Sequence, residues 1–124
     1  MMQDTYNQLT NNRKRLLDLI SKLKKVGDKL AKAEYEYKKK LTLTCFKLKQ
    51  QGYSGEINGE HVEVEPTAWT VTTTLARGIP EVADARLERD TLEGEKEAIM
   101  QDIYRVKLEL GILEKEMEAI RKGE

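Results

Sequence analysis

The stretch TTTLARGIPEVADARLERD, residues 72–90, changes character at its centre. Threonines and a glycine give way to Pro80, and acidic, basic and alanine residues follow in helical order. Gly78 can adopt the left-handed conformation that ends a short helix, and Pro80 fits the first turn of the next helix. Glu81 and Asp84 place negative charge at the positive end of that helix's dipole. The stretch therefore predicts a corner between a short helix and a long one.

Apolar residues recur at coiled-coil spacing on both sides of this corner. Alternating steps of four and three from Leu9 find eight large apolar residues among twelve positions, and the same stepping from Val82 finds ten among twelve. The spacing predicts an all-α fold, in which a helix over 4–51 and a helix over 80–122 form a long antiparallel hairpin. The residues that we expect in its seam, or in a seam with a second copy, are Leu16, Ile20, Leu23, Leu30, Ile99, Ile103, Val106, Leu110 and Leu113.

The connector between the two helices predicts a small β-ribbon at the tip of the hairpin. The pair Asn58-Gly59 favours a tight hairpin turn, with Ile57 before it and alternating Val62 and Val64 after it. We place the ribbon within 52–66 and a short helix at 67–77, in a single domain that spans 1–124.

Charge is divided unevenly along the chain. Residues 1–51 hold 13 Lys and Arg against 5 Asp and Glu, whereas residues 80–124 hold 8 against 13, and the whole chain has no net charge. Antiparallel pairing of facing positions whose numbers add to about 130 would bring the basic helix against the acidic one. That register places Arg13, Lys14 and Arg15 near Glu114, Glu116 and Glu118, and Lys38, Lys39 and Lys40 near Glu88, Asp90 and Glu93.

Catalytic and metal-binding patterns are weak in this sequence. Cys45 is the single cysteine and His61 the single histidine, and a metal site or catalytic dyad would have to recruit carboxylates around His61 such as Glu60 and Glu63. Two thin helices do not supply the concave pocket that a pair of catalytic carboxylates needs. We therefore expect a non-enzymatic protein without cofactor or metal, and the absence of a long apolar run or signal-type N-terminus predicts an intracellular location.

Several segments resemble a family of small, uncharacterised phage and prophage proteins of Gram-positive bacteria. They are LAKAEYEYKKKL (30–41), GYS (52–54), LARGIPEVADARLERD (75–90) and VKLELGILEKEME (106–118). Such proteins are commonly encoded among early phage genes, so the resemblance implies a phage origin and a bacterial host cytoplasm. It supplies no catalytic residues. The chain departs from the family by an insertion, GEINGEHVEVEPTAWT (55–70), between GYS and the short helix.

Apolar residues outside the seam predict a protein-binding module. Leu17, Val26, Phe46, Leu87, Leu108 and Ile112 lie beyond the main stripe, and self-association is the ordinary way to cover them. We expect a partner-binding site at the connector, formed by Tyr53, Ile57, Val62, Val64 and Trp69, because Trp and Tyr dominate binding hot spots. In the alternative, Trp69 closes the end of the helix pair by packing on Phe46 and Leu87.

The phage resemblance suggests two functions. The first is inhibition of a host defence protein such as a CRISPR nuclease, with the acidic second helix in its substrate channel. The alternative is an accessory role in phage DNA replication or recombination, in which the basic first helix binds single-stranded DNA or its binding proteins. We rank nucleic-acid binding second, because the acidic second helix compensates the basic first one.

Overall fold

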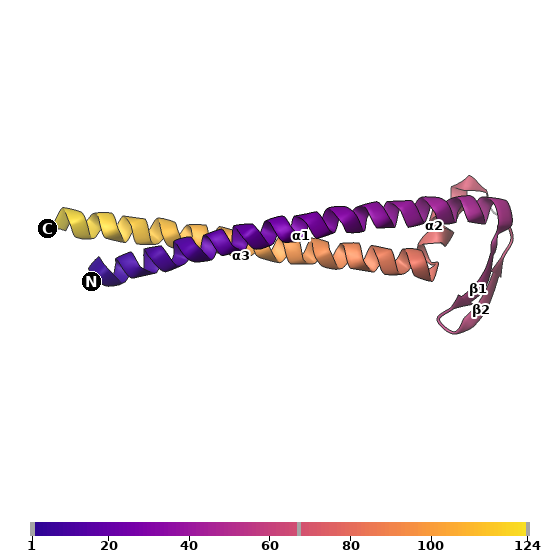
Figure 1. Cartoon of the computed structure of the whole chain (residues 1–124), viewed down its shortest axis with the longest axis horizontal. Coiled ribbons are helices and arrows are strands. Elements are labelled where there is room, and N and C mark those ends of the chain that lie inside the picture. Colours follow the sequence, from indigo (N-terminus) through magenta and orange to yellow (C-terminus); the bar gives the residue numbers. More distant parts are fainter. Residues whose placement is uncertain (1, 67, 124) are drawn as a thin grey trace. The chain divides into compact units, whose positions relative to one another are not determined.

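The computed structural model describes residues 2–66 and 68–123, and the chain is mostly helical. Its elements are α1 (Met2–Gln51), β1 (Tyr53–Ile57), β2 (Glu60–Val64), α2 (Trp69–Arg77) and α3 (Pro80–Gly123) (Figure 1). The prediction of two long helices, a two-stranded ribbon and a short helix is confirmed. Contacts group the chain into two compact units, one made of Met1–Asp28 with Gly94–Glu124 and the other of Lys29–Glu93.

In the first unit, α1 and α3 run antiparallel and share one narrow core. Leu23 lies beside Met100 at one groove, whereas Asn12 lies beside Ile112 at another. Val106 is fully buried at the centre of the core. The buried members of this cluster are Leu9, Leu19, Val106, Leu110 and Leu113, and Leu16, Ile99, Ile103 and Met117 pack against them.

The residues of α3 that we expected in the seam lie in or against this buried cluster, whereas α1 departs from the expected seam at Ile20. Ile20 is 47% exposed, and Leu19 is buried in its place at 8% exposure. The buried residues of this part of α1 follow alternating steps of three and four from Leu9, not of four and three. This pattern includes Val26, which is buried although we expected it outside the stripe. Leu16, Leu23 and Leu30 belong to both phases, so the prediction placed them correctly.

The second unit has its core where α1, α2 and the start of α3 meet. Leu48 is almost fully buried there, in a cluster with Cys45, Ala76 and Ile79. A second cluster joins Tyr37 of α1 to Val82 and Ala85 of α3, and the half-buried Leu41 packs against both clusters. The short α2 is thus held on the helix pair by its buried face, which contains Thr72 and Ala76.

The predicted register is shifted by about one helical turn in the second unit. The guanidinium of Arg89 lies 4.4 Å from the centre of the Tyr37 ring, where the expected register would place Glu93. Arg89 also donates hydrogen bonds of 2.8 and 3.1 Å to Asp90, which raise its pKa above the ordinary value and keep it charged. A charged residue therefore occupies a seam position by stacking on an aromatic ring.

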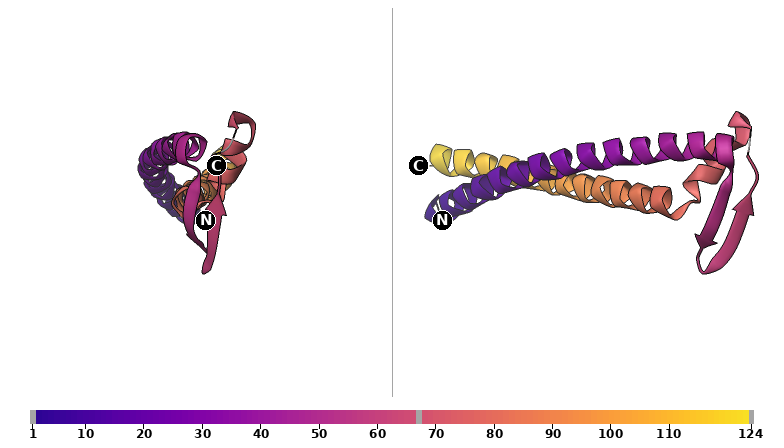
Figure 2. Two further views of the ribbon diagram at one scale, coloured as in Figure 1. Left: turned by 90° about the vertical axis from the view of Figure 1, so that its right-hand side faces the viewer. Right: turned by 45° about the vertical axis from the view of Figure 1, so that its right-hand side comes forward.

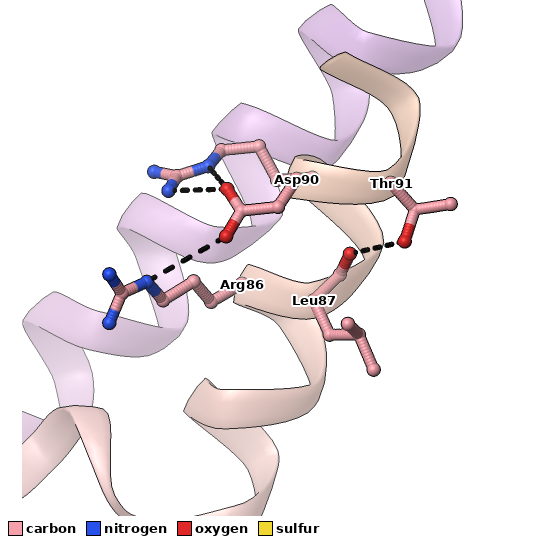
Figure 3. Close-up of polar contacts among 5 residues, drawn as sticks. Arg86, Leu87, Asp90 and Thr91 are labelled. Carbon is pink, nitrogen blue, oxygen red and sulfur yellow. Dashed lines mark hydrogen bonds and ion pairs between the residues drawn. The ribbon is translucent and has the colours of Figure 1, made fainter. Parts of the chain in front are cut away.

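One of the predicted ion pairs between the two helices is present among the described residues. Arg13 lies 4.0 Å from Glu114, as expected. Lys38, Lys39 and Lys40 form no ion pair within the described residues, because Asp90 is held by arginines of its own helix; one is Arg86, 3.9 Å away (Figure 3). An ion pair within one helix joins side chains that are already close to each other. Forming it therefore costs less conformational entropy than forming an ion pair between two helices.

Glycine conformations confirm one predicted turn and correct the other. Asn58 and Gly59 both have positive φ, 52° and 83°, as a tight hairpin turn requires. Gly78 instead has φ −83°, so the α2–α3 corner is an ordinary right-handed turn into Pro80. The left-handed glycine that ends a helix is Gly52, with φ 71°, whose amide donates to Leu48 O at 3.2 Å.

Gly27 and Gly94 lie inside the two long helices, and a Cβ atom built on either residue meets nothing within 4 Å. We predict that Gly27→Ala and Gly94→Ala each stabilise the protein by about 0.5–1 kcal/mol, because alanine loses less backbone entropy in a helix. Gly52→Ala is the control of opposite sign, since its Cβ would collide with Val64 O in a left-handed backbone. Thermal unfolding followed by circular dichroism measures all three; a lower melting temperature for Gly27→Ala or Gly94→Ala would contradict the prediction.

Candidate interaction surfaces

The ribbon has one apolar face, and it carries the predicted partner-binding residues of the strands. Tyr53 pairs with Val64 and Gly55 with Val62 across the antiparallel strands, which Figure 2 shows joined by their turn. Directly paired residues share a face. Tyr53, Ile57, Val62 and Val64 are all half-buried. The structure thus brings four of the five predicted residues to one element.

Tyr53 also has a contact within the core of the second unit. Its ring packs against the cluster of Cys45, Leu48, Ala76 and Ile79. A Cβ atom on Gly55 would lie 2.7 Å from the Tyr53 hydroxyl, so the ring also lies along the ribbon. Tyr53 therefore joins the ribbon to the core of the second unit. Trp69 begins α2, but its side chain lies outside the described part of the structure, and its two predicted roles stay predictions.

The opposite face of the ribbon is polar. His61 lies 3.1 Å from Glu63, and both side chains are exposed. Within the described residues, no group of three or more His, Cys, Asp or Glu side chains is arranged to hold a metal ion. Among the described helices, none combines the length and the apolar character that crossing a membrane would need.

Four large apolar side chains of α3 form an exposed row in the first unit. Met100, Tyr104, Leu108 and Ile112 recur every fourth residue and are between 47% and 61% exposed. Side chains spaced by four form one of the ridges with which helices pack into grooves of other helices. We call these four residues the apolar row. About half of each side chain stays exposed among the described residues, so the row is a surface available for contact.

Half of this row was expected from the sequence. Leu108 and Ile112 were expected outside the seam, whereas Met100 and Tyr104 were missed. The missing signal was the spacing of four, which differs from the alternating three and four of the seam. Leu17, Phe46 and Leu87 were also expected outside the seam, and all three are exposed.

The outer surface of α1 is rich in lysine. Its exposed lysines that form no ion pair within the described residues are Lys14, Lys22, Lys24, Lys25, Lys29, Lys32, Lys38, Lys39, Lys40 and Lys47. The acidic residues of α3 therefore lower the net charge of the chain without neutralising these lysines by direct contact. This finding weakens the ground on which nucleic-acid binding was ranked second.

Comparison with known proteins identified no relative: no family model, no curated protein and no solved structure matches the chain.

We predict that Tyr53→Ala lowers the free energy of unfolding by about 1–2 kcal/mol, less than the change expected at a fully buried aromatic residue. Tyr35→Ala is the matched control, because Tyr35 is exposed on α1 and should change stability by less than about 0.5 kcal/mol. Chemical denaturation followed by circular dichroism compares the two. Equal effects would show that Tyr53 does not anchor the ribbon to the core.

Proposed function

We propose that this chain is a non-enzymatic protein-binding module built on a long antiparallel helical hairpin, with the ribbon and the short helix at its connecting tip. The apolar row of α3 is the observation that carries this proposal. A row of four large side chains at helix-packing spacing is suited to bind a groove or helix of another protein. The aromatic Tyr104 at its centre has the character of a hot-spot residue.

The charges around the apolar row indicate what kind of partner fits. Glu97 lines a groove with Met100 and Tyr104, and Glu109 lies beside Ile112. Lys107 is the basic residue at the first groove. Acidic residues next to an apolar row suit a partner whose binding site is apolar and rimmed by positive charge. Channels that hold nucleic acid have such a rim.

Together with the resemblance to phage proteins, this chemistry favours inhibition of a host defence protein such as a CRISPR nuclease. The protein would act by stoichiometric contact in the cytoplasm of the bacterial host. It would compete with nucleic acid for the positively charged channel, using α3 as the acidic surface. No bond is made or broken in this mechanism, and no cofactor takes part.

We predict that expression of the protein in a Gram-positive host restores infection by a phage that the host's CRISPR nuclease targets. The double substitution Tyr104→Ala with Leu108→Ala should abolish this restored infection. Truncation of a central aromatic anchor weakens binding by about 2 kcal/mol or more, roughly thirtyfold in affinity. Tyr35→Ala with Leu43→Ala is the matched control, with the same residue types exposed on α1. Plaque counts, and pull-down of the purified nuclease, measure the effect. An equal effect of both double variants, or no complex with any nuclease tested, would contradict the proposal.

The alternative function is a role in phage DNA replication or recombination, and the unpaired lysines of α1 favour it. Exposed lysines along one helix can contact successive phosphates of a single strand. Tyr35 is exposed between Lys32 and Lys38 and is available to stack on a base. This function needs the basic surface of α1 and leaves the apolar row without a role.

In this alternative we predict salt-sensitive binding of labelled single-stranded DNA in fluorescence anisotropy. Lys38→Gln, Lys39→Gln and Lys40→Gln together should reduce the slope of log affinity against log salt by about 0.7 for each phosphate that the variant no longer neutralises. The control replaces three lysines of α3, Lys96, Lys107 and Lys115, by glutamine. Absence of binding at low salt, or equal slopes for both triple variants, would exclude the alternative.

A further inference from the structure

A groove between α1 and α3 in the second unit has an apolar floor that stays exposed among the described residues of this unit. Leu87 is 67% exposed on this floor, beside the half-buried Leu92 and the buried Ala33. Thr91 also lies on this floor, and its hydroxyl donates a hydrogen bond of 2.8 Å to Leu87 O (Figure 3). Leu87 and Thr91 extend from α3 away from the side that carries Arg86 and Asp90.

The two edges of this groove carry opposite charges. Lys29 and Lys32 lie on the α1 edge, whereas Asp84 and Glu88 lie on the α3 edge. Glu36 is the exception on the basic edge. None of these five side chains forms an ion pair with a described residue of its own chain. The groove is therefore a strip of apolar surface between a basic and an acidic border, and each border lacks a partner.

A surface with one basic and one acidic border is complementary to a copy of itself. A twofold axis parallel to the helices places α1 of one copy beside α3 of the other at the same level. Lys29 and Lys32 of each copy then face Asp84 and Glu88 of the other, and the two Leu87 side chains meet over the apolar floors. A twofold axis perpendicular to the helices would set lysine against lysine, and like charges in contact are unfavourable.

We propose that this groove is the contact face of a homodimer, in which two copies pack as a four-helix arrangement about a twofold axis parallel to α1 and α3 of the second unit. Neighbouring helices of the two copies run antiparallel, as in the common helix bundles. The proposal goes beyond the proposed function, because it uses a face different from the apolar row and names a second copy of this chain as the occupant.

Charge reversal tests the proposed dimer. One variant combines Lys29→Glu with Lys32→Glu, and the other combines Asp84→Lys with Glu88→Lys. Each variant alone should dissociate at least about tenfold more readily than the wild type, because like charges then face each other across the axis. An equimolar mixture should restore dimers, because the reversed borders of the two variants match. Analytical ultracentrifugation of each sample, with one variant fluorescently labelled in the mixture, measures this.

The controls keep the test independent of folding and of the proposed function. Lys38→Glu with Lys40→Glu reverses exposed charges of α1 outside the groove and should leave the dimer unchanged. Leu87→Asp should also dissociate the dimer, while the helical circular dichroism signal stays unchanged because Leu87 is exposed. The variants of the apolar row, Tyr104→Ala with Leu108→Ala, should keep the dimer, so that failure of partner binding and failure of dimerisation are distinguishable. A wild type that is monomeric at high micromolar concentration, or a mixture that stays monomeric, would overturn the proposal.

Discussion

One constraint governs this protein: two long helices that pack mainly on each other bury a single narrow stripe of each. Val82, Val106 and Leu48 are almost completely buried, and residues one or two positions away are exposed. Most of the surface of the chain is therefore helix surface facing outward. Large apolar side chains on it, such as Tyr104 and Leu87, stay more than half exposed among the described residues. For this reason, the exposed apolar side chains are more informative about function than the buried ones.

The extent of each helix could be predicted from the sequence, but the phase of α1 could not. In α3 the apolar residues follow one repeat, and one choice of steps describes its whole length. In α1 both Leu19 and Ile20 are apolar, so two phases compete, and the choice depends on which stripe packs against α3. Near Ala33, Tyr37 and Leu41, two successive steps of four change the repeat, a local irregularity that a strict heptad cannot represent. The positive-φ glycine was similarly misplaced, because Gly52 and Gly78 both follow a helix.

The candidate surfaces were predicted in part. Leu87, Leu108 and Ile112 could be placed outside the seam, because their positions in the heptad repeat alone decide that. Tyr53 was expected as a binding residue, yet its ring packs on the core, which only the path of the chain after Gly52 reveals. Charge was the weakest guide. Opposite net charges on two helices do not determine which side chains form ion pairs. Asp90, for example, pairs with Arg86 and Arg89 of its own helix.

The two surfaces differ in what their chemistry can do. The groove combines a modest apolar floor with charged borders, and charge of this kind sets orientation and excludes wrong partners more than it adds affinity. The apolar row has four large side chains and few charges, so it suits tight contact with a shaped site. A symmetric dimer displays every surface of the chain twice. Two copies of the apolar row on one particle would raise the effective affinity for a partner that offers two sites, without any new contact within each site. Self-association through the groove and partner binding through the row would then reinforce each other.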